Sequence, residues 1–238
     1  MKGYEMAART SLPGRLPVII RVDGKAFHTY TRGCERPFDA RLAAVMQTTA
    51  LRLCDEIQGA QLAYIQSDEI SILVHGYKRH ASQPWFQNAV QKMVSVAAGI
   101  ASATFTAQSV RIWGEVRDAV FDARAFVVPE ADVCNYFLWR QQDATRNSIQ
   151  MLARSLYSHS ECHLRNTSQL QDMCWSKGHN WNDLETRWKR GTCVVRQQGE
   201  GEEHARWAVD VEPPVFSRQR DYIERLLATV DESGEVAA

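Results

Sequence analysis

The sequence predicts an α+β fold: an antiparallel sheet of the split β-α-β type with both helices on one face, followed by a helical extension and a late hairpin. In the first half, apolar segments follow the order strand, helix, strand, strand, helix, strand. In the second half helical periodicity dominates, and a Gly/Glu turn joins two short strands. A length of 238 residues and a hydrophobic content of 45% are sufficient for one such core.

The first strand and the first helix are defined by their apolar spacing. The stretch "LPVIIRVDG" places three β-branched residues on one face and stops at Asp23 and Gly24. A helix is expected over "FDARLAAVMQTTALRLCDEI", where apolar residues recur every three or four positions. Asp39 is its expected N-cap, and Gly59 ends the pattern.

Two short strands surround a polar turn in "QLAYIQSDEISILV", and the turn holds Ser67, Asp68 and Glu69. A second helix is expected in "SQPWFQNAVQKMVSVAAGIASATF", with its cap near Ser82. The stretch "ARAFVVP" predicts the fourth strand, which Pro129 closes.

The pattern beyond the fourth strand is mostly helical, from residue 132 to about 157 and again from a capping-box start at "TSQLQ". A hairpin is expected from residues 192–196 and 206–211, and a last helix near residues 218–228. We therefore divide the chain into a core, residues 1–130, and a mostly helical extension, residues 131–238, packed on that core as one compact unit.

The apolar runs, cysteines and charged residues of the sequence limit the classes of protein to which the chain can belong. The absence of a run of about 18 apolar residues predicts no membrane span, and the N-terminus lacks the apolar region of a signal peptide, which favours a cytoplasmic protein. Six scattered cysteines without a CxxC pair are expected to be free thiols. The formal net charge is zero, yet residues 140–196 hold nine Lys and Arg against five Asp and Glu, which suits a polyanionic partner.

Two aspartates that are distant in sequence are expected to meet in the fold. The first and third strands of a split β-α-β sheet are adjacent and antiparallel, so Asp23 and Asp68 should lie at one edge of the sheet. Their carboxylates repel each other unless a cation lies between them; the alternative is a pair of solvated turn residues. Mg²⁺ prefers such oxygen ligands, the Gly24 carbonyl among them, and carboxylates that share two metal ions serve nucleotidyl transfer.

Five segments resemble one family, the tRNA-histidine guanylyltransferases and their bacterial and archaeal relatives, which are 3′–5′ polymerases that add nucleotides to the 5′ end of tRNA. The segments are "IIRVDGKAFH", "QSDEIS", "FDAR" followed by an apolar strand, "LWRQQD" and "NWNDLETRWKRG", in that order between residues 16 and 191. The resemblance implies a palm-like, ferredoxin-like catalytic core over residues 1–130. It also implies a homodimer or homotetramer.

The same resemblance implies the site residues. Two Mg²⁺ ions would be held by Asp23, Asp68 and the Gly24 carbonyl, with Glu69 close by as a third catalytic carboxylate. GTP, ATP and other nucleoside triphosphates are the implied substrates, together with tRNA. The implied nucleotide contacts are Asp23, Gly24, Lys25, Ala26, Phe27, His28, Ser67, Asp68, Arg36 and Lys92.

One segment departs from the histidine-specific branch of the family. Eukaryotic members carry His-Ile-Asn-Asn-Leu-Tyr-Asn after the "LWRQQD" position, whereas this chain has "ATRNSIQM", residues 144–151. The departure favours a bacterial-type relative that repairs 5′-truncated tRNA and uses the opposite strand as template. The alternatives are a histidine-tRNA-specific guanylyltransferase, a palm-fold nucleotide cyclase and a non-catalytic RNA-binding protein.

Aromatic residues beside cations are the main candidates for RNA contact, because bases stack on aromatic rings and phosphates pair with cations. The candidates, with two residues of the departing segment, are Trp139, Arg140, Arg146, Asn147, Lys189 and Arg190. A zinc site from Cys162, His163, Cys174 and His179 is an alternative reading of a local cluster. Its spacing matches no standard ligand pattern, so free thiols and surface imidazoles are favoured.

Overall fold

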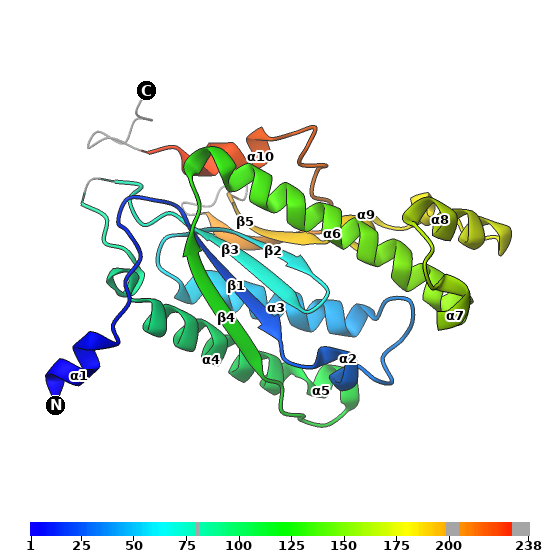
Figure 1. Ribbon diagram of the computed structural model, residues 1–238, viewed down its shortest axis with the longest axis horizontal. Helices are drawn as coiled ribbons and strands as arrows, with labels where there is room; N and C mark the ends of the chain where they lie inside the picture. The colour runs from blue at the N-terminus through cyan, green and yellow to red at the C-terminus, as the bar shows by residue number, and fades with distance from the viewer. Residues whose placement is uncertain (80, 199–204, 230–238) are drawn as a thin grey trace.

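The centre of the molecule is a six-stranded antiparallel sheet. The structure is a computed structural model that describes residues 1–79, 81–198 and 205–229. The strands are β1 (Val18–Gly24), β2 (Ala60–Gln66), β3 (Glu69–Val74), β4 (Phe121–Val127), β5 (Thr192–Gln197) and β6 (Arg206–Asp210). Their order is β4-β1-β3-β2-β5-β6 (Figure 1). The predicted α+β fold, with the first and third strands adjacent and antiparallel, is confirmed.

Helices cover both faces of this sheet. The helices α3 (Ala40–Glu56) and α4 (Val90–Gln108) pack on one face, and α6 (Glu130–Leu156) crosses the other (Figure 1). Because side chains alternate across a strand, Ile72 enters the core under α3 and α4, whereas its neighbour Leu73 packs against α6. Helices α3 and α4 therefore cover one face of the sheet, and α6 covers only part of the other face.

Helix α3 begins where the sequence predicted it. The Asp39 side chain accepts the backbone N–H groups of Arg41 and Leu42, which an uncapped helix would leave without partners. The buried face of α3 includes Met46 and Leu53, which lie in the main core.

Helix α4 begins at Val90, not near Ser82 as predicted. Phe86, Gln87 and Asn88 have positive φ values of 50°, 53° and 58°, which a right-handed helix does not allow. The N-terminal segment holds this turn, because the Asn88 side chain donates to the Pro13 carbonyl at 3.0 Å. The local pattern missed this feature since the partner lies 75 residues away.

The extension is mostly helical, and its hairpin joins the sheet of the core. Strand β5 pairs with β2, and β6 pairs with β5. The connection between them includes residues 199–204, which lie outside the described residues. The helices here are α7 (His159–Cys162), α8 (Thr167–Ser176), α9 (Thr186–Arg190) and α10 (Asp221–Glu224). The last predicted helix is only α10 followed by a 3₁₀ turn, Arg225–Leu227.

In the first half of the chain, the short helices α1 (Lys2–Ala7), α2 (Phe27–Tyr30) and α5 (Val110–Trp113) were not predicted. Helix α1 has no buried residue and extends away from the body of the molecule (Figure 1). Helix α2 follows the end of β1 directly, which places it beside the turn between β2 and β3.

One helical stretch of the described chain, Val90–Trp113, is long and apolar enough to cross a membrane by length and composition. One of its faces, with Met93, Ala97 and Phe105, is packed in the core beneath the sheet. Core helices of soluble proteins pass the same test, so the absence of a membrane span stays a prediction.

Candidate active site

The turn between β2 and β3 brings Asp68 beside the end of β1. The Gly24 N–H donates to the Asp68 carbonyl at 3.2 Å, and Asp23 pairs with Glu69 in the ladder between β1 and β3. Ser67 has a φ of 50°, an uncommon left-handed conformation for a residue with a side chain. Such strain at a turn is typical of functional sites.

Both aspartates lie where a negative charge is costly. Burial raises the pKa of Asp23, and the carboxylate of Asp122 adds repulsion. Burial also raises the pKa of Asp68, and repulsion from Asp23 contributes in the same direction. A divalent cation between the two aspartates would relieve both effects, because it favours the charged carboxylates.

The donor set fits Mg²⁺ on chemical grounds. Two carboxylates and a backbone carbonyl are hard oxygen ligands, and they leave positions for water and substrate phosphates. A Cβ atom at Gly24 would lie only 2.3 Å from the Phe27 ring, so the close approach of this backbone requires glycine. In the part of the chain that the structure describes, no three His, Cys, Asp or Glu side chains form a metal site by themselves.

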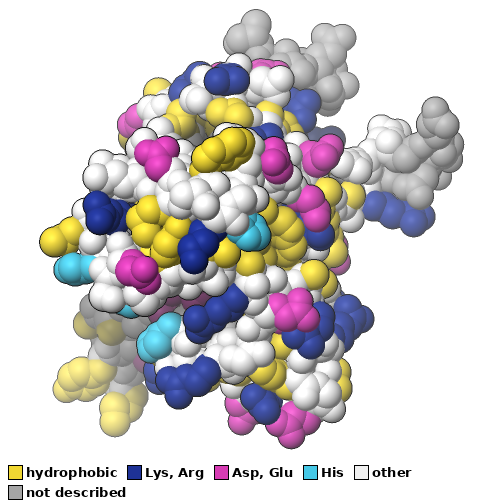
Figure 2. Space-filling model, turned by 90° about the vertical axis from the view of Figure 1, so that its right-hand side faces the viewer, with side chains coloured by type: hydrophobic (Ala, Val, Ile, Leu, Met, Phe, Trp, Pro, Cys, Tyr) yellow, Lys and Arg dark blue, Asp and Glu magenta, His cyan; other side chains and the backbone are white. Residues whose placement is uncertain are grey.

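A cleft of about 620 Å³ opens beside Asp68. It lies between the residues after β1 and the C-terminal half of α6. Its basic side chains are His28, Arg32, Arg36 and Arg154. This end of the molecule shows Lys, Arg and His side chains around hydrophobic surface (Figure 2). Guanidinium groups are well suited to bind the oxygens of a polyphosphate.

The cleft continues into a pocket of about 120 Å³ with a mostly apolar lining. The two share Asp39, Leu42, Ser67, Asn147 and Met151 in their walls. Two aromatic side chains, Phe38 and Trp188, also line the pocket and stack with ring centroids 5.1 Å apart. A space with apolar walls next to an arginine-lined cleft has the character expected of a nucleotide site.

The segment that departs from the histidine-specific pattern lies on α6 and faces this space. The lining residues from it are Ala144, Asn147, Ser148, Gln150 and Met151. Their spacing of three or four positions puts them on one side of the helix. The sequence difference therefore falls on the wall of the candidate site and not on a distant surface.

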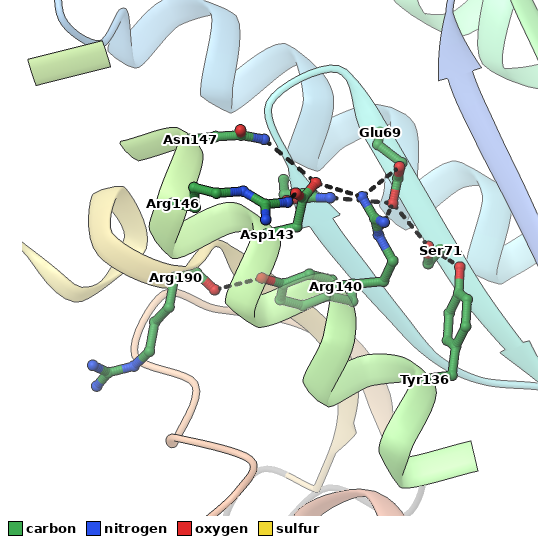
Figure 3. Close-up of polar contacts among 10 residues, drawn as sticks. Glu69, Ser71, Tyr136, Arg140, Asp143, Arg146, Asn147 and Arg190 are labelled. Atoms are coloured by element: carbon green, nitrogen blue, oxygen red, sulfur yellow. Dashed lines mark hydrogen bonds and ion pairs between the residues drawn. The ribbon is translucent and has the colours of Figure 1, made fainter. Parts of the chain in front are cut away.

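Glu69 lies on the α6 side of the sheet and lines neither the cleft nor the apolar pocket. The Arg140 guanidinium donates to its two carboxylate oxygens at 2.9 and 3.1 Å, and Ser71 Oγ donates at 3.3 Å (Figure 3). The side chain of Glu69 is thus paired inside the protein. Asp23, its register partner on β1, shares this face of the sheet and also lines neither space, so Glu69 lies close to a predicted metal ligand and its role as a catalytic carboxylate stays a prediction.

The structure corrects the expectation that Arg140 faces RNA. The residue is only 6% exposed, and its guanidinium also donates to Asp143 at 2.8 Å (Figure 3). It is therefore the central cation of an ion-pair network inside the fold. Arg146 joins the exposed side of this network by pairing with Asp143.

Replacing Arg140 by leucine should lower the free energy of unfolding by about 3–5 kcal/mol, because Glu69 would remain buried without a partner. Urea unfolding measures this change. The matched control is Arg146→Ala on the same helix, whose exposed pair with Asp143 should contribute less than about 1 kcal/mol. Equal small losses in both variants would contradict a stabilising role for the buried pair.

Two of the predicted nucleotide contacts, Lys92 and Lys25, do not line the cleft. Lys92 lies at the start of α4, near Phe86, whereas Phe105 near the end of α4 packs on Phe27 beside the cleft. Lys92 and Phe105 are 13 positions apart, a span of about 20 Å of helix, so Lys92 lies away from the cleft in this chain and its contact with the triphosphate stays a prediction. Lys25 is exposed but does not line the cleft.

The other predicted nucleotide contacts near β1 differ in whether they line the cleft or belong to the core. Gly24, Ala26 and His28 line the cleft. The ring of Phe27 is buried in an aromatic cluster and stacks on Tyr30 with centroids 5.0 Å apart, which makes it mainly a core residue. Arg32 and Arg154, which the sequence reasoning did not single out as nucleotide contacts, line the same cleft.

The remaining residues that were predicted to contact RNA differ in whether their side chains already bind other groups of the protein. Trp139 is half exposed, with the Arg140 guanidinium 4.3 Å from its ring centroid. Lys189 Nζ donates to the Asn182 carbonyl at 2.7 Å, and Arg190 Nε donates to the Pro213 carbonyl at 2.9 Å. Both cations therefore also hold the fold together. Asn147 lines the cleft.

The six cysteines are free thiols, as expected. Cys174 is buried and Cys162 is partly buried, while His163 and His179 are exposed. In the described residues this group does not form a metal site.

The fold and the site together define a palm-type nucleotidyltransferase. A family model described as tRNAHis guanylyltransferase matches residues 1–129. The tRNA(His) guanylyltransferase of Debaryomyces hansenii is 30% identical over 206 residues, which cover 76% of this chain and 73% of that protein. The chain belongs to the tRNAHis guanylyltransferase family.

Two solved structures of this type are similar over almost the whole chain. A bacterial tRNA(His) guanylyltransferase (Thg1)-like protein in complex with ATP is 45% identical, with a TM-score of 0.90 and coverage of 95% of this chain and 96% of that chain. A protein of the same description in complex with GTP is 42% identical, with a TM-score of 0.83 and the same coverage.

Proposed function

We propose that this enzyme adds nucleotides in the 3′–5′ direction to the 5′ end of tRNA, and that it repairs 5′-truncated tRNA by copying the opposite strand. The observation that carries the proposal is that five residues of the segment 144–151, which departs from the histidine-specific pattern, line the cleft that opens at Asp68 or the apolar pocket that continues it. A histidine-tRNA-specific guanylyltransferase is the alternative within the family.

The nucleotide would occupy the cleft with its triphosphate near the arginines and its base in the apolar pocket. The solved relatives bind ATP and GTP, which supports nucleoside triphosphates as substrates here. Arg32, Arg36 and Arg154 provide the positive charge. The stacked pair Phe38 and Trp188 provides an apolar wall suited to the face of a base.

Asp23, Asp68 and the Gly24 carbonyl would hold two Mg²⁺ ions in this proposal. Bound Mg²⁺ supplies charge that stabilises the attacking and leaving oxygens of an in-line displacement. The chain itself positions the groups: the register between β1 and β3 fixes the aspartates, and the cleft orients the polyphosphate. Growth at the 5′ end requires the 3′-hydroxyl of the incoming nucleotide to attack a phosphate at the RNA 5′ end, with pyrophosphate leaving when that end is a triphosphate.

RNA would meet Trp139, Arg146 and Asn147 along α6, and Lys189 and Arg190 at α9. The exposed ring of Trp139 can stack on a base, and the cations can pair with phosphates. We propose a cytoplasmic location, where tRNA is the available polyanion.

The proposed homodimer or homotetramer is consistent with apolar groups on the surface. In α1, Tyr4 and Met6 are 83% and 70% exposed. Val96 and Val110 are exposed in the stretch from α4 to α5. Light scattering on the purified chain measures the assembly directly, and a mass equal to one chain, 27.1 kDa, would reject this part of the proposal.

A single assay separates the proposed enzyme from its alternatives. The purified protein is incubated with a tRNA that lacks its first nucleotide and carries a 5′-triphosphate, together with labelled nucleoside triphosphates and Mg²⁺. Label in a tRNA extended by one nucleotide supports the proposal. Label in a cyclic nucleotide would indicate a cyclase, and tRNA binding without any product would indicate a non-catalytic RNA-binding protein.

A further inference from the structure

A second pocket, of about 150 Å³, lies where α6 gives way to α7 and α8. Its wall carries four basic side chains, Arg154, His159, His163 and Arg165. No carboxylate of the described residues lines it. A volume about ten times the roughly 15 Å³ that admits a water molecule leaves room for a hydrated phosphate group.

The basic groups of this pocket are not neutralised within the described chain. Neither Arg154 nor Arg165 forms an ion pair with any described residue, and both are exposed. The nearest acidic residue in sequence, Glu161, accepts from the Ser158 N–H at 2.8 Å and from Ser158 Oγ at 2.6 Å as part of the cap of α7. The pocket therefore presents uncompensated positive charge and N–H donors.

The pocket is continuous with the candidate active site. Gln150 and Arg154 line both the cleft beside Asp68 and this basic pocket. Asn147, Gln150 and Arg154 follow one another at spacings of three and four, so they form one side of α6. A polyanionic strand that ends in the cleft would meet Arg154 at the shared wall and then enter the basic pocket.

The backbone of the pocket contains a strained residue. Leu164 has a φ of 60° and is 89% exposed, so no packing of its own side chain compensates for the left-handed conformation. It lies between His163 and Arg165, and all three residues line the pocket. The capping box of α8, formed by Asn166 and Gln169, follows this turn directly.

We propose that this basic pocket is a phosphate subsite for the RNA substrate, in which Arg165, Arg154 and the two histidines bind backbone phosphates of the strand whose 5′ end lies in the cleft. The inference rests on the proposed function, because it requires tRNA as the substrate. The same chemistry would also suit the triphosphate of a free nucleotide, and the experiment must separate these two sources.

The test measures the affinity of the intact protein for a fluorescent 5′-truncated tRNA between about 50 and 200 mM salt. Arg165→Gln and the double variant His163→Gln, Arg165→Gln remove exposed side chains that form no ion pair or side-chain hydrogen bond with the described residues. The matched control is Arg218→Gln, an exposed arginine just before α10 in the sequence. Helix α10 lies at the opposite end of α6 from α7 (Figure 1).

Loss of one phosphate contact should reduce the slope of log affinity against log salt by about one in Arg165→Gln, with no change in the control. The affinities for ATP and GTP should stay at the wild-type level. A wild-type slope in both pocket variants would overturn the proposal, and so would a loss of ATP or GTP affinity at an unchanged slope, which would assign the pocket to the nucleotide. Wild-type protein that binds no tRNA would instead reject the proposed function on which the subsite depends.

Discussion

Asp68→Ala and Asp23→Ala should each reduce nucleotide addition by at least about 100-fold, the scale seen when one charge-stabilising group is lost from an active site. Asp68 lines the cleft, whereas Asp23 lies at the end of β1 beside it and does not line it. Each variant removes one of the two carboxylates that would hold Mg²⁺ there. The metal-free variants should be slightly more stable than the wild type, because repulsion between the aspartates disappears. Turnover is measured with labelled nucleotide and truncated tRNA, and folding is followed by thermal unfolding.

The matched control for these variants is Asp122→Asn. Asp122 pairs with Asp23 across β4 and β1, but its side chain is 57% exposed and is not among the predicted metal ligands. We expect near-normal turnover from this variant. Mg²⁺ should raise the unfolding temperature of the wild type and of the control, and not that of the Asp23 or Asp68 variants. Near-normal turnover by Asp23→Ala or Asp68→Ala in Mg²⁺ would refute the metal-site assignment.

The sequence predicted those parts of the fold that depend on local patterns and on simple topology. Alternating apolar residues located the strands, and the Asp39 cap located the start of α3. The rule that the first and third strands of a split β-α-β sheet are neighbours placed Asp23 and Asp68 at one sheet end, which the register between β1 and β3 matches.

Features that depend on distant partners were beyond the sequence pattern. Glu69 follows Asp68 directly, yet strand alternation turns its side chain toward Arg140, 71 residues away. Helix α4 starts late because Pro13 and Leu12 bind the turn that precedes it. Arg154 lines the cleft because of the way in which α6 packs across the sheet. The periodicity of the sequence does not encode the direction in which a helix crosses a sheet.

The choice of the added nucleotide depends on whether side chains of the site recognise guanine by direct contacts. A dedicated guanine pocket would need free groups matched to guanine, and among the described residues the only carboxylate that lines the apolar pocket belongs to Asp39. Its oxygens already accept five hydrogen bonds from Glu35, Arg41 and Leu42, and this pairing with Arg41 holds the pKa of Asp39 well below its usual range. The residue is 5% exposed, so its carboxylate is not available to a base.

The side-chain amides of this pocket do not favour one base. Gln66 Oε1 is buried without a partner within the described structure. As an acceptor it suits the amino groups of adenine, cytosine and guanine alike. Side-chain amides such as those of Gln47 and Asn147 offer both a donor and an acceptor, so they adapt to different base edges.

We therefore expect Watson–Crick pairing with the opposite strand to decide which nucleotide is added. A tRNA that lacks its first nucleotide and carries a 5′-triphosphate should receive the complement of the facing acceptor-stem base, whatever its anticodon. The measurement is incorporation of each of the four labelled nucleotides against each of the four template bases. Each change of the template base should shift the preferred nucleotide accordingly. Guanosine added regardless of template, or activity restricted to histidine tRNA, would exclude repair and restore the histidine-specific alternative, because only a direct reader of guanine and anticodon behaves in that way.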